Sequence, residues 1–200
     1  MKRVLCILLL VLSGAVAPAK GPHFTYGLEW GYTATFFKHA DYNFICSEGY
    51  RINETHDIWW YYSNGAILAN AGVDLTRKLN VSAYSGLLGV YSHRWVIPAE
   101  VRVRYCPAGN DRNGPVFHAG GGATFPTSTL TETAGRGLIG GGYRFSIFRS
   151  MSVDFLLSFN LTFDHDLITD PDTHGYVPHS AITTNMSEYY AVCASIALNF

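Results

Sequence analysis

The densest group of side chains able to bind a metal ion lies between residues 164 and 179. Carboxylate and imidazole groups occur there at Asp164, His165, Asp166, Asp170, Asp172, His174 and His179. Such groups bind metal ions when a rigid element fixes their spacing. Because the spacing here is irregular, the segment is interpreted as a solvated surface loop, and no metal ligand is assigned.

A second chemical pattern is Gly135-Arg136-Gly137-Leu138-Ile139-Gly140, which matches the glycine spacing of dinucleotide-binding loops, with Asp154 downstream. Such a loop needs a helix that begins within it, so that backbone N–H groups can hold pyrophosphate. No helical periodicity follows, so no cofactor is expected. The glycines at 120–122 and 140–142 are expected instead to leave room for neighbouring arginine or aromatic side chains, or to bend a strand.

Residues 1–19 have the three regions of a secretory signal peptide. Lys2 and Arg3 precede an apolar run at 4–12, and Ala17-Pro18-Ala19 supplies the small residues of a cleavage site. As a helix the run would span about 14 Å, too short for a hydrocarbon core of about 30 Å. Export with cleavage after Ala19 is therefore predicted, which leaves residues 20–200 as one domain.

The composition is poor in charge. Charged residues make up 14% of the chain, whereas soluble domains contain about a quarter. This difference suggests that something other than water covers part of the surface. The formal net charge of -1 leaves no basic footprint, so nucleic-acid binding is excluded.

After residue 20 the sequence alternates with the period of two that is typical of β-strands. The clearest segments, each with one apolar and one polar or small face, are 24–36, 95–105, 153–163 and 188–200. Weaker segments are 67–76, 79–91, 116–125 and 137–147. Eight strands are therefore predicted.

The connections between these segments differ in length. Short links are expected at 77–78, 106–115 and 148–151, and long loops at 38–64, 126–136 and 164–187. Brief turns at one end and long loops at the other are typical of outer-membrane barrels. The predicted fold is all-β, an eight-stranded antiparallel up-and-down transmembrane β-barrel. The aromatic run 58–62 is interpreted as the end of the second strand, extended above the membrane, with a glycan- or protein-binding surface as the alternative.

A soluble lipocalin-like calyx would also be all-β, but its apolar face points inward around a ligand. In a membrane barrel the polar face points inward. The polar faces here carry small polar residues and few charges, which suits a narrow lumen. The expected lumen charge network, in which opposite charges neutralise one another, is Glu29, Asp74, Glu100, Arg102, Arg104, Arg144 and Asp154.

The last strand presents Tyr190, Val192, Ile196, Leu198 and Phe200 on one face, and it resembles the C-terminal signature strand of outer-membrane proteins. The run Ile-Pro-Ala-Glu-Val-Arg-Val-Arg-Tyr at 97–105, before a turn and a glycine-rich strand, is similar to small Bacteroidota barrels. From about residue 23 to 200 the chain resembles barrels of the OmpA-transmembrane or OmpX type. The resemblance implies recognition of the last strand by the barrel-insertion machinery, contact with outer-membrane lipid and lipopolysaccharide, a periplasmic C-terminus and extracellular long loops.

Barrels of this size also include enzymes that remove or transfer the acyl chains of lipid A. The corresponding bases here would be His93, His118 or His165, but the His-x-Ser arrangement of the deacylases is absent. His118 is expected to face the lumen near the periplasmic end. A lipid-A acyl-modifying enzyme therefore stays an alternative, and no catalytic residue is assigned.

An eight-stranded barrel is just wide enough for side chains to fill it, so a plugged lumen is predicted. The sequence thus favours a monomeric, non-enzymatic outer-membrane protein acting in surface contact or envelope support, with loops that could meet an extracellular protein or glycan. Three cysteines remain after cleavage. Cys46 is expected outside the cell, Cys106 in a periplasmic turn and Cys193 in the wall, with no disulfide between them.

Overall fold

A computed structural model describes residues 23–91, 94–127, 133–148 and 151–200. The predicted signal peptide, His93 and part of the predicted loop 126–136 lie outside these residues. None of the helices in the described ranges is long and apolar enough to cross a membrane.

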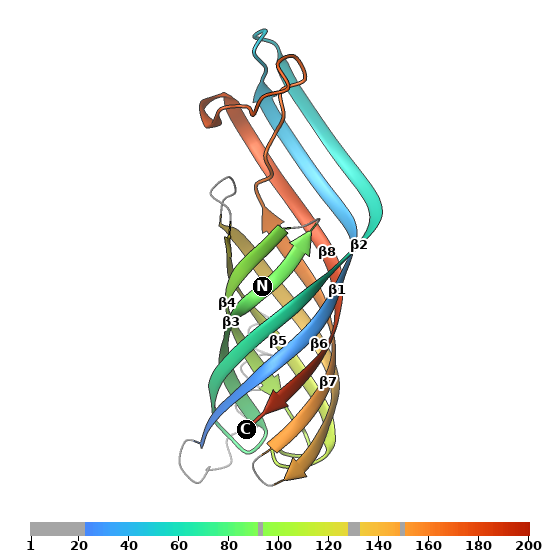
Figure 1. Cartoon of the computed structure of the whole chain (residues 1–200), viewed down its shortest axis with the longest axis vertical. Coiled ribbons are helices and arrows are strands. Elements are labelled where there is room, and N and C mark those ends of the chain that lie inside the picture. Colours follow the sequence, from blue (N-terminus) through green and yellow to red (C-terminus); the bar gives the residue numbers. More distant parts are fainter. Residues whose placement is uncertain (1–22, 92–93, 128–132, 149–150) are drawn as a thin grey trace, which may run out of the picture.

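Eight antiparallel strands close into one barrel in chain order, with β1 beside β8 (Figure 1). The strands are β1 His23–Ile45, β2 Arg51–Asp74, β3 Leu79–Tyr91, β4 Arg94–Tyr105, β5 Gly114–Pro126, β6 Ala134–Phe148, β7 Met151–Asp164 and β8 Ile182–Asn199. A short 3-10 helix, η1, spans His179–Ala181 before β8. The predicted eight-stranded antiparallel barrel is confirmed.

The two faces of each strand differ as the alternation predicts. On β1 the outward side chains are exposed and apolar: Phe24, Tyr26, Leu28, Trp30 and Tyr32. Glu29, Thr33 and Thr35, which alternate with them, are buried. The exterior of the barrel is therefore apolar and the interior largely polar, the reverse of a calyx.

A register shift between Thr35 and Phe37 interrupts the pairing of β1 with both neighbours. A shift of one residue moves the following side chains to the opposite face of a strand. Lys38 and Ala40 are consequently buried, although even-numbered side chains before the shift point outward. The register shift also ends the strict alternation of apolar and polar residues in the sequence at this point.

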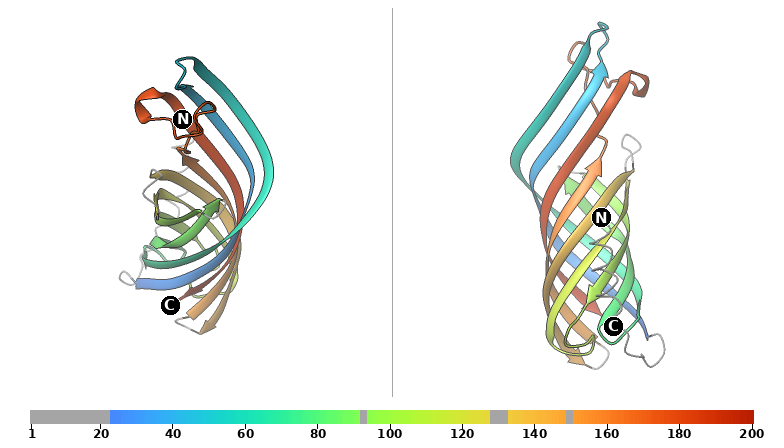
Figure 2. Two further views of the ribbon diagram at one scale, coloured as in Figure 1. Left: turned by 45° about the horizontal axis from the view of Figure 1, so that its top comes forward. Right: turned by 180° about the vertical axis from the view of Figure 1, so that it is seen from behind.

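The predicted long loop at 38–64 is wrong. β1 and β2 continue through this segment and leave only residues 46–50 as a turn. β8 follows β1 as far as the pair Phe44 and Ile182. The three strands rise beyond the barrel rim as a curved sheet, here called the extension (Figures 1 and 2). Hydrogen bonds between the strands satisfy the backbone polar groups there, and beyond the closed wall of the barrel the side chains no longer need to alternate between two environments.

Two further loops are shorter than predicted. β6 begins at Ala134, so the segment 134–136 belongs to the barrel wall. β8 begins at Ile182, so the last loop is 165–181. Pairing with neighbouring strands overrides the weak local pattern of both segments.

Glycines make room for large lumen side chains, as predicted. A Cβ on Gly120 would lie 2.6 Å from Cγ of Arg102, and one on Gly140 would lie 2.7 Å from Nε2 of His118. Both side chains are buried. Larger residues at these glycines would displace them.

Candidate functional site

The side chains in the middle of the barrel join around Glu100 on β4. Its carboxylate accepts hydrogen bonds from Arg102, 3.0 Å from Nε, and from Arg136 on β6. Arg102 also reaches Glu29 on β1, with nitrogen-to-oxygen distances of 3.0 and 3.1 Å. Arg136 donates to Asn160 on β7 at 2.8 Å. This central group connects four strands across the lumen.

A second group surrounds Asp154 on β7. Arg144 on β6 donates to both carboxylate oxygens at 2.7 Å. Arg104 on β4 lies 3.3 Å from the same carboxylate, and it donates to Asn199 on β8 at 2.7 Å and to the Tyr84 hydroxyl on β3. In this group, here called the lower group, two guanidinium groups share one fully buried carboxylate.

The structure brings the residues predicted for the lumen into these two groups, with one exception. Asp74 lies at the rim of the barrel, where Oδ1 accepts hydrogen bonds from Asn80 at 2.9 Å and from Asn110 at 2.8 Å. Sequence reasoning missed Arg136 because it falls in a segment predicted to be a loop. Its even-numbered spacing from Gly140 and Arg144 is the signal that could have placed it in the lumen.

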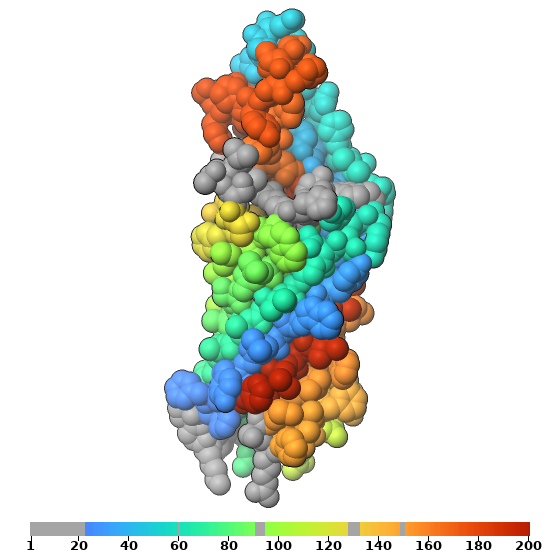
Figure 3. All heavy atoms as spheres, in the orientation of Figure 1, coloured from blue at the N-terminus to red at the C-terminus, as the bar shows by residue number. Residues whose placement is uncertain are grey.

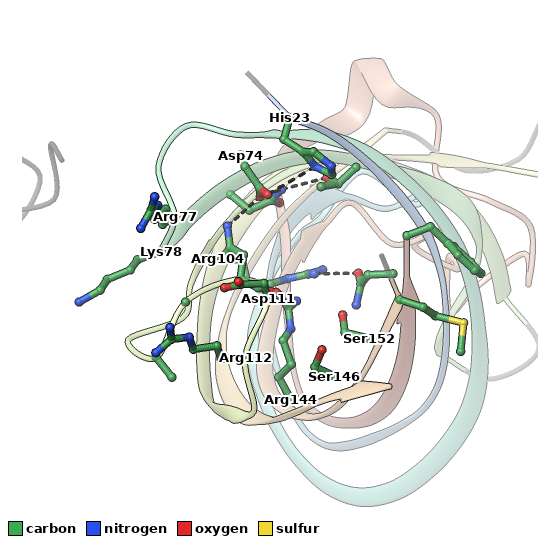
Figure 4. Close-up of a pocket in the computed structure, with 18 of the residues that line it drawn as sticks. His23, Asp74, Arg77, Lys78, Arg104, Asp111, Arg112, Arg144, Ser146 and Ser152 are labelled. Carbon is green, nitrogen blue, oxygen red and sulfur yellow. Dashed lines mark hydrogen bonds and ion pairs between the residues drawn. The ribbon is translucent and has the colours of Figure 1, made fainter. Parts of the chain in front are cut away.

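A cavity of about 590 Å³ opens at the end of the barrel that carries the short turns, here called the turn end (Figure 4). Arg104 and Arg144 form part of its inner lining with Ser152. The figure also shows three cationic side chains at the edge, directed away from the centre: Arg77, Lys78 and Arg112.

Asn110, in the turn between β4 and β5, partly covers this cavity. Its backbone N–H donates to the Arg77 carbonyl at 2.7 Å, and its carbonyl accepts from Arg144 at 2.8 Å. Its side chain donates to Asp74 at 2.8 Å. The turn is thereby fixed to β2 and β6 at the mouth of the barrel.

At the opposite, loop end, outward side chains change from aromatic to charged along one line. The aromatic row is Trp59, Phe37 and Tyr190, and the next row, closer to the tip, is Asp57, His39 and Glu188. Phe37 lies 4.6 Å from the Trp59 ring and 5.3 Å from the Tyr190 ring. His39 Nδ1 lies 2.6 Å from the Asp57 carboxylate. A membrane interface would produce this kind of boundary.

The loop 165–181 folds back onto the extension (Figure 3). Asp166 accepts a hydrogen bond from Lys38 at 2.5 Å, and Asp170 accepts one from the Ser47 backbone N–H at 2.8 Å. Beneath it, Phe44, Cys46, Ile168 and Val177 form a small apolar core. The aspartates of the predicted metal-capable segment thus hold the loop in place.

The other predicted chemistry does not converge. In the described part of the chain no group of three or more His, Cys, Asp or Glu side chains could hold a metal ion. His118 lies four residues into β5 at the turn end, whereas His165 follows β7 at the loop end. The cysteines Cys46, Cys106 and Cys193 are buried and free.

The outward residues of the final strand lie as the pattern predicts. Val192 and Ile196 are exposed, and Tyr190, Leu198 and Phe200 are half-buried. Phe200 pairs with Tyr26 through two backbone hydrogen bonds of 3.2 and 2.8 Å. This pairing closes the barrel at the turn end, where the rings of the two residues also stack.

Two of the solved structures to which the chain is similar are outer-membrane proteins. OprG from Pseudomonas aeruginosa is 10% identical over 88% of this chain and 95% of its own, with a TM-score of 0.48. AlkL, determined in lipid bilayers, is 13% identical over 92% of this chain and 95% of its own, with a TM-score of 0.41. No family pattern and no curated protein sequence matches. At this identity the likeness concerns the fold alone.

Proposed function

We propose that this protein is an integral outer-membrane barrel with a lumen plugged by side chains, whose extension makes contacts outside the cell. The observation that carries the proposal is the reversal of faces: apolar side chains cover the exterior, and charges fill the interior. Exposed Trp30 and Leu28 would be unfavourable in water at about 25 cal/mol per Å² of apolar surface. In lipid the same surface is stabilising, and a closed barrel leaves no unpaired edge within the membrane.

The two ends of the barrel differ, and the proposed orientation of the barrel in the membrane is based on that difference. The row containing His39 would lie at the outer surface, with the extension in the extracellular medium. The short turns and Phe200 would face the periplasm. Bacterial barrels place their brief turns on the periplasmic side, which supports this orientation.

A plugged lumen is supported by the central and lower groups. Ion pairs between β1, β4 and β6, and a hydrogen bond from Arg136 to Asn160 on β7, occupy the interior of a barrel that is only wide enough for side chains. Solutes would have to break several buried charged hydrogen bonds to pass. We therefore place the activity of the protein on its outer surface.

The extension offers a suitable contact surface. Residues 51–65 of β2 pair with β1, but the pairing with β3 begins only at Ala66. Within the described residues, this stretch has a strand partner on one side only. An open edge presents backbone donors and acceptors to an added strand. It contains no Lys or Pro, two of the residues that protect such edges, although it carries charge at Arg51, Glu54 and Asp57.

The test is a shortened variant in which residues 39–57 of the extension are replaced by a tight turn. It should still insert as a heat-modifiable barrel, because the pairs that close the wall are retained. Cells that carry it should bind surfaces coated with extracellular protein less than cells that carry the full chain. A deletion within the periplasmic turn at Asp111 serves as the control. Equal binding by all three strains would refute a contact role.

A further inference from the structure

The cavity at the turn end has a positive character that the proposed surface role does not use. Five cationic side chains line or flank it, namely Arg77, Lys78, Arg104, Arg112 and Arg144. The opposing side-chain carboxylates are Asp74, Asp111 and Asp154. Among these side chains the positive charges outnumber the negative ones, five to three, before His23 is counted.

Two of the five cationic side chains belong to the inner wall. Arg104 and Arg144 are 6% and 5% exposed in their side chains, and they share the single carboxylate of Asp154. A guanidinium group has five N–H donors. Arg144 uses three of these donors, toward Asp154 and the Asn110 carbonyl. Donors of both arginines therefore remain for a further acceptor.

A neutral donor lies in the same lining. Ser152 is buried on β7 and contributes to the cavity wall, and it makes no hydrogen bond through its side chain within the described part of the chain. Ser146 on β6 also lines the cavity, but its hydroxyl donates to the Phe148 carbonyl at 3.2 Å, so Ser152 is the neutral donor that remains; Figure 4 shows both serines inside the ring of strands near Arg144. Hydroxyl and guanidinium donors together match the oxygens of a tetrahedral or planar anion.

From this arrangement we infer that the cavity binds a soluble oxyanion, a phosphate or carboxylate group, presented from the periplasm. The lipid headgroup is a less suitable source, because the cavity opens along the barrel axis and the strands separate it from the surrounding bilayer. Arg77, Lys78 and Arg112 point away from the centre and would act at longer range, by raising the local anion concentration. The arginines of the inner wall would make the contacts.

The experiment uses the full mature chain in nanodiscs of zwitterionic phosphatidylcholine, labelled with ¹⁵N-arginine. Inorganic phosphate is titrated at constant low ionic strength, with chloride as the reference anion. Saturable shifts of the Arg104 or Arg144 side-chain signals are expected with phosphate but not with chloride. Shifts confined to Arg77 and Arg112, or an equal response to chloride, would overturn the inference.

Variants distinguish direct contacts with the anion from the long-range electrostatic attraction of the cationic side chains at the edge. Ser152→Ala should weaken phosphate binding several-fold, and neutralising Arg77, Lys78 and Arg112 together should weaken it about 10-fold at low salt. Arg51→Gln, at the far end of the molecule, should leave the affinity unchanged. Heat-modifiable migration checks that each variant is folded. If shifts at Arg104 and Arg144 occur only in discs with anionic lipid and without added phosphate, the ligand is a headgroup and the inference fails.

Discussion

Glu100 shows at the scale of one residue why the lumen charges belong together. Its carboxylate has no exposed surface and accepts from both Arg102 and Arg136. Removing one partner of a buried ion pair leaves uncompensated charge, which costs more than the pair contributes to stability. Each charge of the network is therefore stabilised only while its oppositely charged partners are present.

Glu100→Gln should lower the free energy of unfolding by about 3–5 kcal/mol, because the buried Arg136 loses its carboxylate partner and Arg102 keeps only that of Glu29 within the described residues. Glu54→Gln is the matched control, since Glu54 is exposed on the extension and bonds only to His56 within the described residues. It should cost less than about 1 kcal/mol. Urea unfolding in lipid vesicles measures both. Combining Glu100→Gln with Arg136→Gln should recover part of the loss, and equal costs for the two single variants would contradict this account.

At the scale of an element, the loop 165–181 depends on ionised aspartates. Burial opposes ionisation of the Asp166 carboxyl, but hydrogen bonds from Lys38 and Tyr189 outweigh burial and hold its pKa below the ordinary value. Hydrogen bonds from the backbone of Asp172 and from Ser47 lower the pKa of Asp170 in the same way. A lowered pKa in the folded protein means that ionisation stabilises the docked loop.

This contribution is complete above the ordinary aspartate pKa of about 3.9, and it disappears as the pH falls through the lower folded-state values. Spin labels at Thr173 and Glu48 should therefore report a single distance at pH 7 and a broad distribution in strong acid. Asp166→Asn should broaden it already at pH 7, whereas Asp111→Asn in the turn end should not. A distribution that is independent of both pH and Asp166 would show that the apolar core alone holds the loop.

At the scale of the whole molecule, the proposed plug of the lumen should prevent conduction. In planar bilayers the protein is expected to show no large, stable single-channel conductance. Replacing Glu29, Glu100, Arg102 and Arg136 together by alanine should open a measurable pathway, if the barrel still inserts. Shortening the extension should not, because its residues lie beyond the barrel rim. Steady conductance by the unmodified chain would rule out a plugged lumen.

Much of the barrel could be predicted from the sequence because a strand in a barrel wall must alternate strictly between two environments. Phe24, Leu28 and Trp30 face outward and Glu29 faces inward, as their positions alone indicate. The extension could not be predicted in this way. Beyond Phe37 neither face has to be uniformly apolar, so the strands there carry no periodic signal, although they remain paired.

The candidate sites could likewise be predicted only in part from the sequence. The sequence by itself determined the strand number and the inward face of most charged lumen residues, Arg136 excepted, because period-two alternation is a local property of the chain. Only the tertiary structure decided that Arg136 reaches Glu100, that Arg104 and Arg144 share Asp154 at the head of a cavity, and that Asp166 holds a distant loop. Those contacts depend on the register between strands, which is set by the closure of the whole barrel.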